Sequence, residues 1–163
     1  MKKVPKPAKT PCQTIDDLLD DPPNNPKALQ HWPLQHSNTI ARNWLLIMGR
    51  LVKEKKKPFE QTYILEVGGG YTGQTAMLSC SPCLTATRAQ EGGHWISNRG
   101  RMFNDAEMMR LMGMNPARLE VPEGVSQRQF RAMIGNSMDV TVLKALLRSL
   151  CVAMPSVFEN CYR

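Results

Sequence analysis

The chain has 163 residues, of which 42% are hydrophobic and 21% charged, and this composition favours a folded domain with one core over a disordered chain. Twenty-one Lys and Arg exceed fourteen Asp and Glu, and the net charge of +7 favours a polyanionic partner, nucleic acid before an anionic membrane. No apolar run approaches the ~20 residues that span a bilayer, and an odd number of cysteines, five, favours reduced thiols. We therefore expect an intracellular protein that is neither a membrane protein nor a disulfide-rich secreted one.

The N-terminal third predicts a basic arm followed by two helices. Residues 1–13 hold four Lys and three Pro and should form a flexible arm. Thr14 can cap a short helical turn over 14–20. The clearest helix spans about 37–56, ends before Pro58 and carries an apolar stripe at helical spacing: Ile40, Trp44, Leu45, Ile47, Met48, Leu51 and Val52. The lysines that crowd its end have two interpretations, a solvated helix end or contacts to DNA phosphate.

The middle of the chain predicts short strands separated by glycine. We expect strands over 63–67, 83–88 and 94–97, the last two joined as a hairpin through Gly92 and Gly93. This segment is β-rich and irregular.

Hydroxyl and basic side chains gather in the same segment. Strand alternation would place Thr85 and Thr87 on one face as a row of hydroxyls, with Arg88, Arg99 and Arg101 nearby. Such groups bind phosphate, and Arg also reads guanine. The alternative is an exposed hairpin whose polar residues have no special role.

Helices return in the last third. Asn104 starts one that reaches about Met112, Ser126 starts another, and a final helix spans 138–154. The final helix carries an apolar face made of Val142, Leu143, Leu146, Leu147 and Leu150. Helix, irregular β segment and helices in this order predict an α+β fold.

Three short motifs suggest chemistry but lack its context. Gly68–Gly73 contains G-x-G-x-x-G after a strand, as nucleotide and S-adenosylmethionine sites do, yet no crossover helix follows. Cys80 and Cys83 have the spacing of a zinc half-site without two further ligands, so we expect no metal site. Cys12 sits in Pro-Cys-Gln, but its proline-rich flank does not form the rigid strand that a nucleophilic cysteine needs.

Three later segments resemble DNA (cytosine-5) methyltransferases. Residues 81–88, Ser-Pro-Cys-Leu-Thr-Ala-Thr-Arg, with the two glycines after them, resemble the Pro-x-Leu-Thr-x-Ser/Thr-Arg strand and glycine run that close the family's target-recognition domain. Residues 101–113 are similar to the motif Glu-x-x-Arg-Leu-x-Gly, and residues 134–138, Ile-Gly-Asn-Ser-Met, to the last motif, which an apolar helix follows. Together these segments extend over nearly half the chain in the family's order.

The resemblance implies a division of the chain into four parts. It implies a flexible basic arm at 1–13, an irregular β-rich target-recognition domain at 14–103, a helical part at 104–154 that belongs to an incomplete Rossmann-like methyltransferase domain, and a tail at 155–163.

The resemblance also implies roles for individual residues. Double-stranded DNA would be contacted by Thr85, Thr87, Arg88, Gly92 and Gly93. The pocket for S-adenosyl-L-methionine would be lined on one side by Asn136 and Ser137, while Glu107 and Arg110 would tie the recognition domain to the core.

The family's catalytic motifs are missing. No credible Pro-Cys-Gln nucleophile, Glu-Asn-Val acid or cofactor loop is present, so we expect no catalytic residues and no activity from this chain alone. The resemblance implies the C-terminal portion of a methyltransferase, located with the DNA (in the nucleus of a eukaryote), with a missing N-terminal catalytic half as a further partner. The alternatives are a stand-alone, non-catalytic DNA-binding module and an S-adenosylmethionine enzyme built around Gly68–Gly73.

Overall fold

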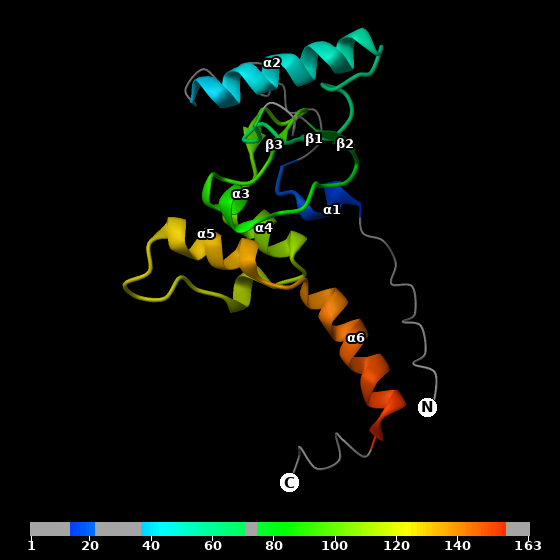
Figure 1. The fold of residues 1–163 in the computed structure, drawn as a ribbon, viewed down its shortest axis with the longest axis vertical. Coiled ribbons are helices and arrows are strands. Elements are labelled where there is room, and N and C mark those ends of the chain that lie inside the picture. The colour runs from blue at the N-terminus through cyan, green and yellow to red at the C-terminus, as the bar shows by residue number, and fades with distance from the viewer. Residues whose placement is uncertain (1–13, 22–36, 71–74, 156–163) are drawn as a thin grey trace.

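In the computed structural model, the described residues are 14–21, 37–70 and 75–155, and their helices lie on both sides of a small antiparallel sheet (Figure 1). The chain is an α+β protein, as the sequence predicted. The helices are α1 (Ile15–Leu18), α2 (Asn38–Lys53), α3 (Ala86–Gln90), α4 (Asp105–Leu111), α5 (Gln127–Asn136) and α6 (Val140–Ala153), with a 3₁₀ helix, η3, at Pro116–Arg118. The predicted arm at 1–13, with Cys12, and the tail after 155 lie outside the described residues.

The sheet has four short strands in the order β2-β1-β3-β4, and every neighbouring pair is antiparallel. The central pair places Leu65 opposite Trp95, and Trp95 in turn lies opposite Met102. The predicted strands near 63–67 and 94–97 are confirmed in shorter form. Their bounds are β1 (Tyr63–Leu65), β2 (Ala76–Leu78), β3 (Trp95–Ile96) and β4 (Arg101–Met102).

The two faces of the sheet are covered by different helices. Helix α2 packs on one face, because alternation in β1 directs Tyr63 and Leu65 to one side and Ile64 to the other. The α2 cluster contains Trp44, Ile47, Met48, Leu51, Tyr63, Leu65, Val67 and Trp95, all buried. On the other face the core joins α1, α3, α4 and α5 through Ile15, Ile64, Leu84, Ala89, Ile96, Phe103, Met108, Met109, Phe130 and Ile134.

Capping residues set the starts of three helices, and those of α4 and α5 were predicted from the sequence. The side chains of Ser37, Asn104 and Ser126 accept hydrogen bonds from backbone N–H groups in the first turns of α2, α4 and α5. Asn104 and Ser126 form complete capping boxes with Glu107 and Gln129. For α4 and α5 these local signals were sufficient to place the helix start.

The predicted strand over 83–88, and its hairpin with 94–97, are wrong. Thr85 ends an irregular stretch and caps α3 instead, its hydroxyl accepting a hydrogen bond from the Arg88 N–H at 3.4 Å. The residues of α3 are mostly good helix formers, and Gly92 follows with a φ of +94°. Thr85 and Thr87 therefore do not form a row on one strand face, and β3 pairs with β1.

Helix α6 leaves the rest of the fold after its first turn (Figure 1). The Val140 N–H donates to the Met112 carbonyl at 2.9 Å, which ties the start of α6 to the end of α4. Beyond that point Val142, Leu146 and Leu147 are 45–56% exposed. The sequence predicted a core helix, but these three residues of its apolar face are exposed, while Leu143 and Leu150 are half-buried.

Candidate functional site

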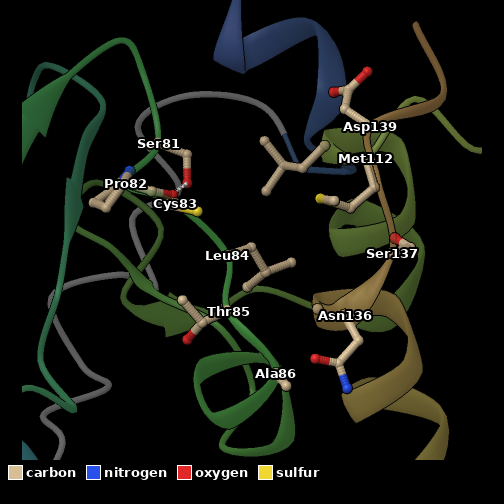
Figure 2. A pocket seen from close by; sticks show the side chains of 12 residues that line it. Ser81, Pro82, Cys83, Leu84, Thr85, Ala86, Met112, Asn136, Ser137 and Asp139 are labelled. Atoms are coloured by element: carbon tan, nitrogen blue, oxygen red, sulfur yellow. Dashed lines mark hydrogen bonds between the residues drawn. The ribbon is translucent and has the colours of Figure 1, made fainter. Parts of the chain in front are cut away.

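A pocket of about 630 Å³ lies where the irregular segment 81–86 meets the ends of α4 and α5 and the start of α6 (Figure 2). Leu84 and Met112 supply apolar surface inside it. Segments of all three methyltransferase-like motifs line this one space. The lining residues are Ser81, Pro82, Cys83, Leu84, Thr85, Ala86, Leu111, Met112, Gly135, Asn136, Ser137 and Asp139.

Asn136 and Ser137 form one wall, at the junction of α5 and α6. The Ser137 hydroxyl donates to the Ile134 carbonyl at 2.6 Å and so closes the last turn of α5. The Asn136 side chain lies across from Ala86 and Thr85 in Figure 2, and no described residue shares a hydrogen bond with its amide. Asn136 therefore offers both a donor and an acceptor to a ligand in the pocket.

Gly135 holds the two walls together by direct backbone contact. A Cβ at this position would lie 2.5 Å from the Thr85 carbonyl oxygen and 2.7 Å from the Ala86 Cα. No real Cβ contact is that short, so α5 approaches the start of α3 as closely as it does because residue 135 is glycine. The sequence predicted Asn136 and Ser137 as pocket residues but not Ser81–Ala86 as the opposite wall.

Few groups in the pocket could move a proton. The titratable groups among its lining residues are the thiol of Cys83 and the carboxylate of Asp139. Asp139 caps α6, where its Oδ1 accepts from the N–H groups of Thr141 and Val142 at 2.7 and 3.0 Å. The Asp139 carboxylate is therefore engaged in capping, and apart from the Cys83 thiol the other lining groups are apolar, hydroxyl or amide. The pocket is suited to holding a ligand rather than to acid–base chemistry.

Arg88, a predicted DNA contact, is engaged inside the protein. Its Nη1 donates to the Gly68 carbonyl at 2.6 Å and to the Glu91 carboxylate at 3.0 Å, and its Nε lies 3.3 Å from Glu66 Oε1. The side chain is 18% exposed. A phosphate could reach Arg88 only in competition with two carboxylates.

Gly92 and Gly93, two further predicted DNA-contact residues, form the exit from α3. Gly93 has a φ of +79°, and a Cβ there would lie 3.2 Å from the side chains of Phe103 and Met108. Both glycines are buried. Their positions have a structural explanation that requires no DNA.

Arg99 and Arg101 are also paired with carboxylates. Arg99 is fully buried, and its guanidinium contacts Asp16 Oδ1 at 2.9 Å together with the backbone carbonyl of Asp21. Arg101 binds Glu107 in a bidentate manner, with both N–O distances 2.8 Å, and this ion pair raises the pKa of the guanidinium. The Arg99 contacts fasten residues 14–21 to the loop between β3 and β4, and the Arg101–Glu107 pair joins β4 to α4.

Glu107 joins α4 to β4 and to residues 14–21. Its carboxylate is completely buried and accepts from Arg101 and from the backbone N–H groups of Asp20 and Asn104 at 3.0 and 2.9 Å. Arg110, one turn later, donates to the Leu18 carbonyl at 2.8 Å. Both residues of α4 therefore hold α1 in place.

His94 supports the wall formed by residues 81–86. Its ring is buried against Phe103, and Nε2 lies 3.4 Å from the Cys83 carbonyl oxygen. Burial lowers the pKa of His94, so the ring is neutral at pH 7 and Nε2 can donate to this carbonyl. Sequence reasoning left His94 without this role, because the contact depends on how β3 packs on the irregular segment.

The remaining motifs do not form sites among the described residues. Cys80 and Cys83 are exposed and free, and no described group of three or more His, Cys, Asp or Glu is arranged to hold a metal ion. After Gly68–Gly70 the chain returns as β2, antiparallel to β1, so the βαβ unit of a nucleotide site is not formed. Residues 71–73 of that motif lie outside the described ranges. Within those ranges, no helix has the length and apolarity needed to cross a membrane.

No protein-family model matches the chain, and neither the curated proteins nor the solved structures contain a match to it. The resemblance to DNA (cytosine-5) methyltransferases therefore depends on the three motif segments and on how they are arranged.

Proposed function

We propose that this chain is the C-terminal portion of an S-adenosylmethionine-dependent DNA (cytosine-5) methyltransferase, which supplies DNA recognition and one wall of the cofactor pocket. The observation that carries the proposal is the pocket of Figure 2. Segments about 20 or more residues apart in sequence, selected only for their motif pattern, line the same space. A chance resemblance gives no reason for the three to meet.

The properties of the pocket fit a cofactor of this size and polarity. Its volume of about 630 Å³ falls within the usual range for small-molecule sites, roughly 300–1,000 Å³. Leu84 and Met112 can pack against the apolar surface of a purine ring, and the unpaired amide of Asn136 can hydrogen-bond to a polar edge. When bound, the cofactor supplies the methyl group, and the residues of this chain position it and exclude water.

The exposed apolar face of α6 supports the proposal that a partner is missing. Val142, Leu146 and Leu147 are neighbours on this face at helical spacing and are 45–56% exposed, and adjacent exposed apolar side chains of this kind are uncommon on a self-contained monomer. We propose that the N-terminal catalytic half covers this face and closes the cofactor pocket. A stand-alone DNA-binding module would not need an exposed apolar face on α6. The exposed face therefore favours the split or truncated enzyme over that alternative.

The proposal predicts that Asn136 affects cofactor binding. In an assembly reconstituted from this chain and a catalytic half of the family, Asn136→Leu should raise the KM for S-adenosylmethionine roughly three- to tenfold, because one neutral hydrogen bond is lost. The measurement is tritiated-methyl transfer to duplex DNA at varied cofactor concentration.

The matched control is Asn38→Leu, the same change on the exposed first turn of α2, far from the pocket. It should leave the KM unchanged. Equal KM values for both variants and the wild type would contradict the placement of Asn136 in the cofactor pocket.

A further inference from the structure

The arginines in the segment that the sequence predicted to contact DNA are not available to bind phosphate. Each arginine that packs around the sheet and α4 is within 3.3 Å of a carboxylate oxygen, and all are at most 31% exposed: Arg88, Arg99, Arg101, Arg110 and Arg131. These side chains are used for folding. A surface that attracts phosphate must be made of other cations.

The end of α2 and the turn after it, residues 50–57, carry such cations. The basic turn, as we call these eight residues, has five cations and one carboxylate, Glu54. Lys53 and Lys55 are exposed and have no ion pair within the described residues. Lys56 pairs with Glu54 and Lys57 with Glu60, but these side chains are 45–65% exposed, so phosphate can displace the carboxylates at little cost.

Lys55 occupies a backbone position that normally selects glycine. Its φ is +56°, and it sits just past the end of α2, where the Lys56 N–H donates to the Leu51 carbonyl at 3.0 Å and the Lys55 N–H to the Val52 carbonyl at 2.9 Å. This is a Schellman turn, in which glycine is the usual residue because a Cβ in the left-handed region is strained. A lysine there costs stability, and strain of this kind often marks a functional site.

We infer that the basic turn is a binding surface for the phosphate backbone of duplex DNA. This inference rests on the proposed function and deepens it by locating the phosphate contact on α2, away from Arg88. A membrane surface fits less well, because the exposed apolar residues of α2, Leu45, Leu46 and Val52, are interrupted by Gly49 and Arg50. Insertion into a bilayer interface needs a continuous apolar face.

The test is Lys55→Gly in the full chain. This substitution should raise thermal stability, because it relieves backbone strain, and should weaken DNA binding, because it removes a phosphate contact. Relief of the left-handed strain should raise the Tm by roughly 2–4 °C. Loss of one phosphate contact should lower the log–log salt slope of binding to a mixed-sequence duplex oligonucleotide by about one unit and weaken binding roughly 5–10-fold at 0.1 M salt.

Two controls separate the causes. Ser79→Gly relieves the other left-handed non-glycine residue among those described, with a φ of +54°, without changing charge. It should raise the Tm and leave DNA binding unchanged. Lys144→Ala removes a charge from an exposed position on α6, outside the basic turn, and should not change the salt slope. A double variant, Lys53→Ala with Lys55→Gly, extends the test: it removes two phosphate contacts and should lower the salt slope by about two units.

If Lys55→Gly binds duplex DNA with the same affinity and salt slope as the wild type, the basic turn is not the phosphate-binding surface. That result would leave the proposed function intact. Binding of the wild type to phosphatidylserine vesicles but not to DNA, with loss in Lys55→Gly, would also overturn it and assign the turn to a lipid surface. No DNA binding at low salt would overturn both this inference and the DNA-recognition part of the proposed function.

Discussion

Replacing Gly135 with alanine is expected to destabilise the protein by about 2–4 kcal/mol and to lower its Tm by roughly 5–15 °C. The new Cβ would lie 2.5–2.7 Å from the backbone of Thr85 and Ala86, and backbone cannot rotate away as a side chain can. Helix α5 must then move from α3, which also opens the pocket between them. Thermal unfolding followed by circular dichroism measures the effect.

Gly49→Ala is the matched control for that experiment. Gly49 also lies inside a helix, α2, but nothing is within 4 Å of its Cβ position. Alanine there should stabilise the protein by about 0.5–1 kcal/mol, since it lowers the conformational entropy of the unfolded chain. Shifts of the Tm in the same direction and by similar amounts in both variants would contradict the close contact between Gly135 and Thr85.

Glu107→Ala is expected to cost about 3–5 kcal/mol, because it removes the buried partner of Arg101 and leaves the N–H groups of Asp20 and Asn104 without an acceptor. The loss should be measured as the free energy of unfolding in urea. Residues 14–21 should also become more sensitive to protease, because Glu107 fastens that segment to α4.

The control for Glu107 is Glu123→Ala, which removes an exposed carboxylate that forms no hydrogen bond or ion pair with a described residue. Its effect should stay within about 0.5 kcal/mol. A loss below about 1 kcal/mol for Glu107→Ala would show that the buried network contributes little to folding.

Local signals explain which parts of the fold the sequence predicted. Asn104 and Ser126 each precede their helices in a capping pattern, and the apolar stripe of α2 repeats at 3.6 residues, so those elements could be predicted. The strand over 83–88 was wrong because its alternating Thr residues resemble a strand. The decisive signal was Thr85 as an N-cap, with Gly92 after the helix formers of α3.

The arrangement of the candidate site depended on contacts far apart in sequence. Arg99 and Asp16 are 83 residues apart, and nothing local indicates that they pair. The same is true of Arg88 with Glu66, which is why sequence reasoning treated these arginines as available to DNA. The pocket wall at Asn136 could be named from its motif, but its partner wall required knowledge of how Gly135 packs on Thr85.

The most direct test of the proposed function is tritiated-methyl transfer to cytosine-containing duplex DNA in three samples: this chain, a catalytic half of the family, and their mixture. The proposal predicts transfer only in the mixture, because this chain lacks the nucleophile and the catalytic acid while the other half lacks the pocket wall at Asn136 and Ser137. Transfer by this chain alone, or a mixture no more active than the catalytic half, would contradict it.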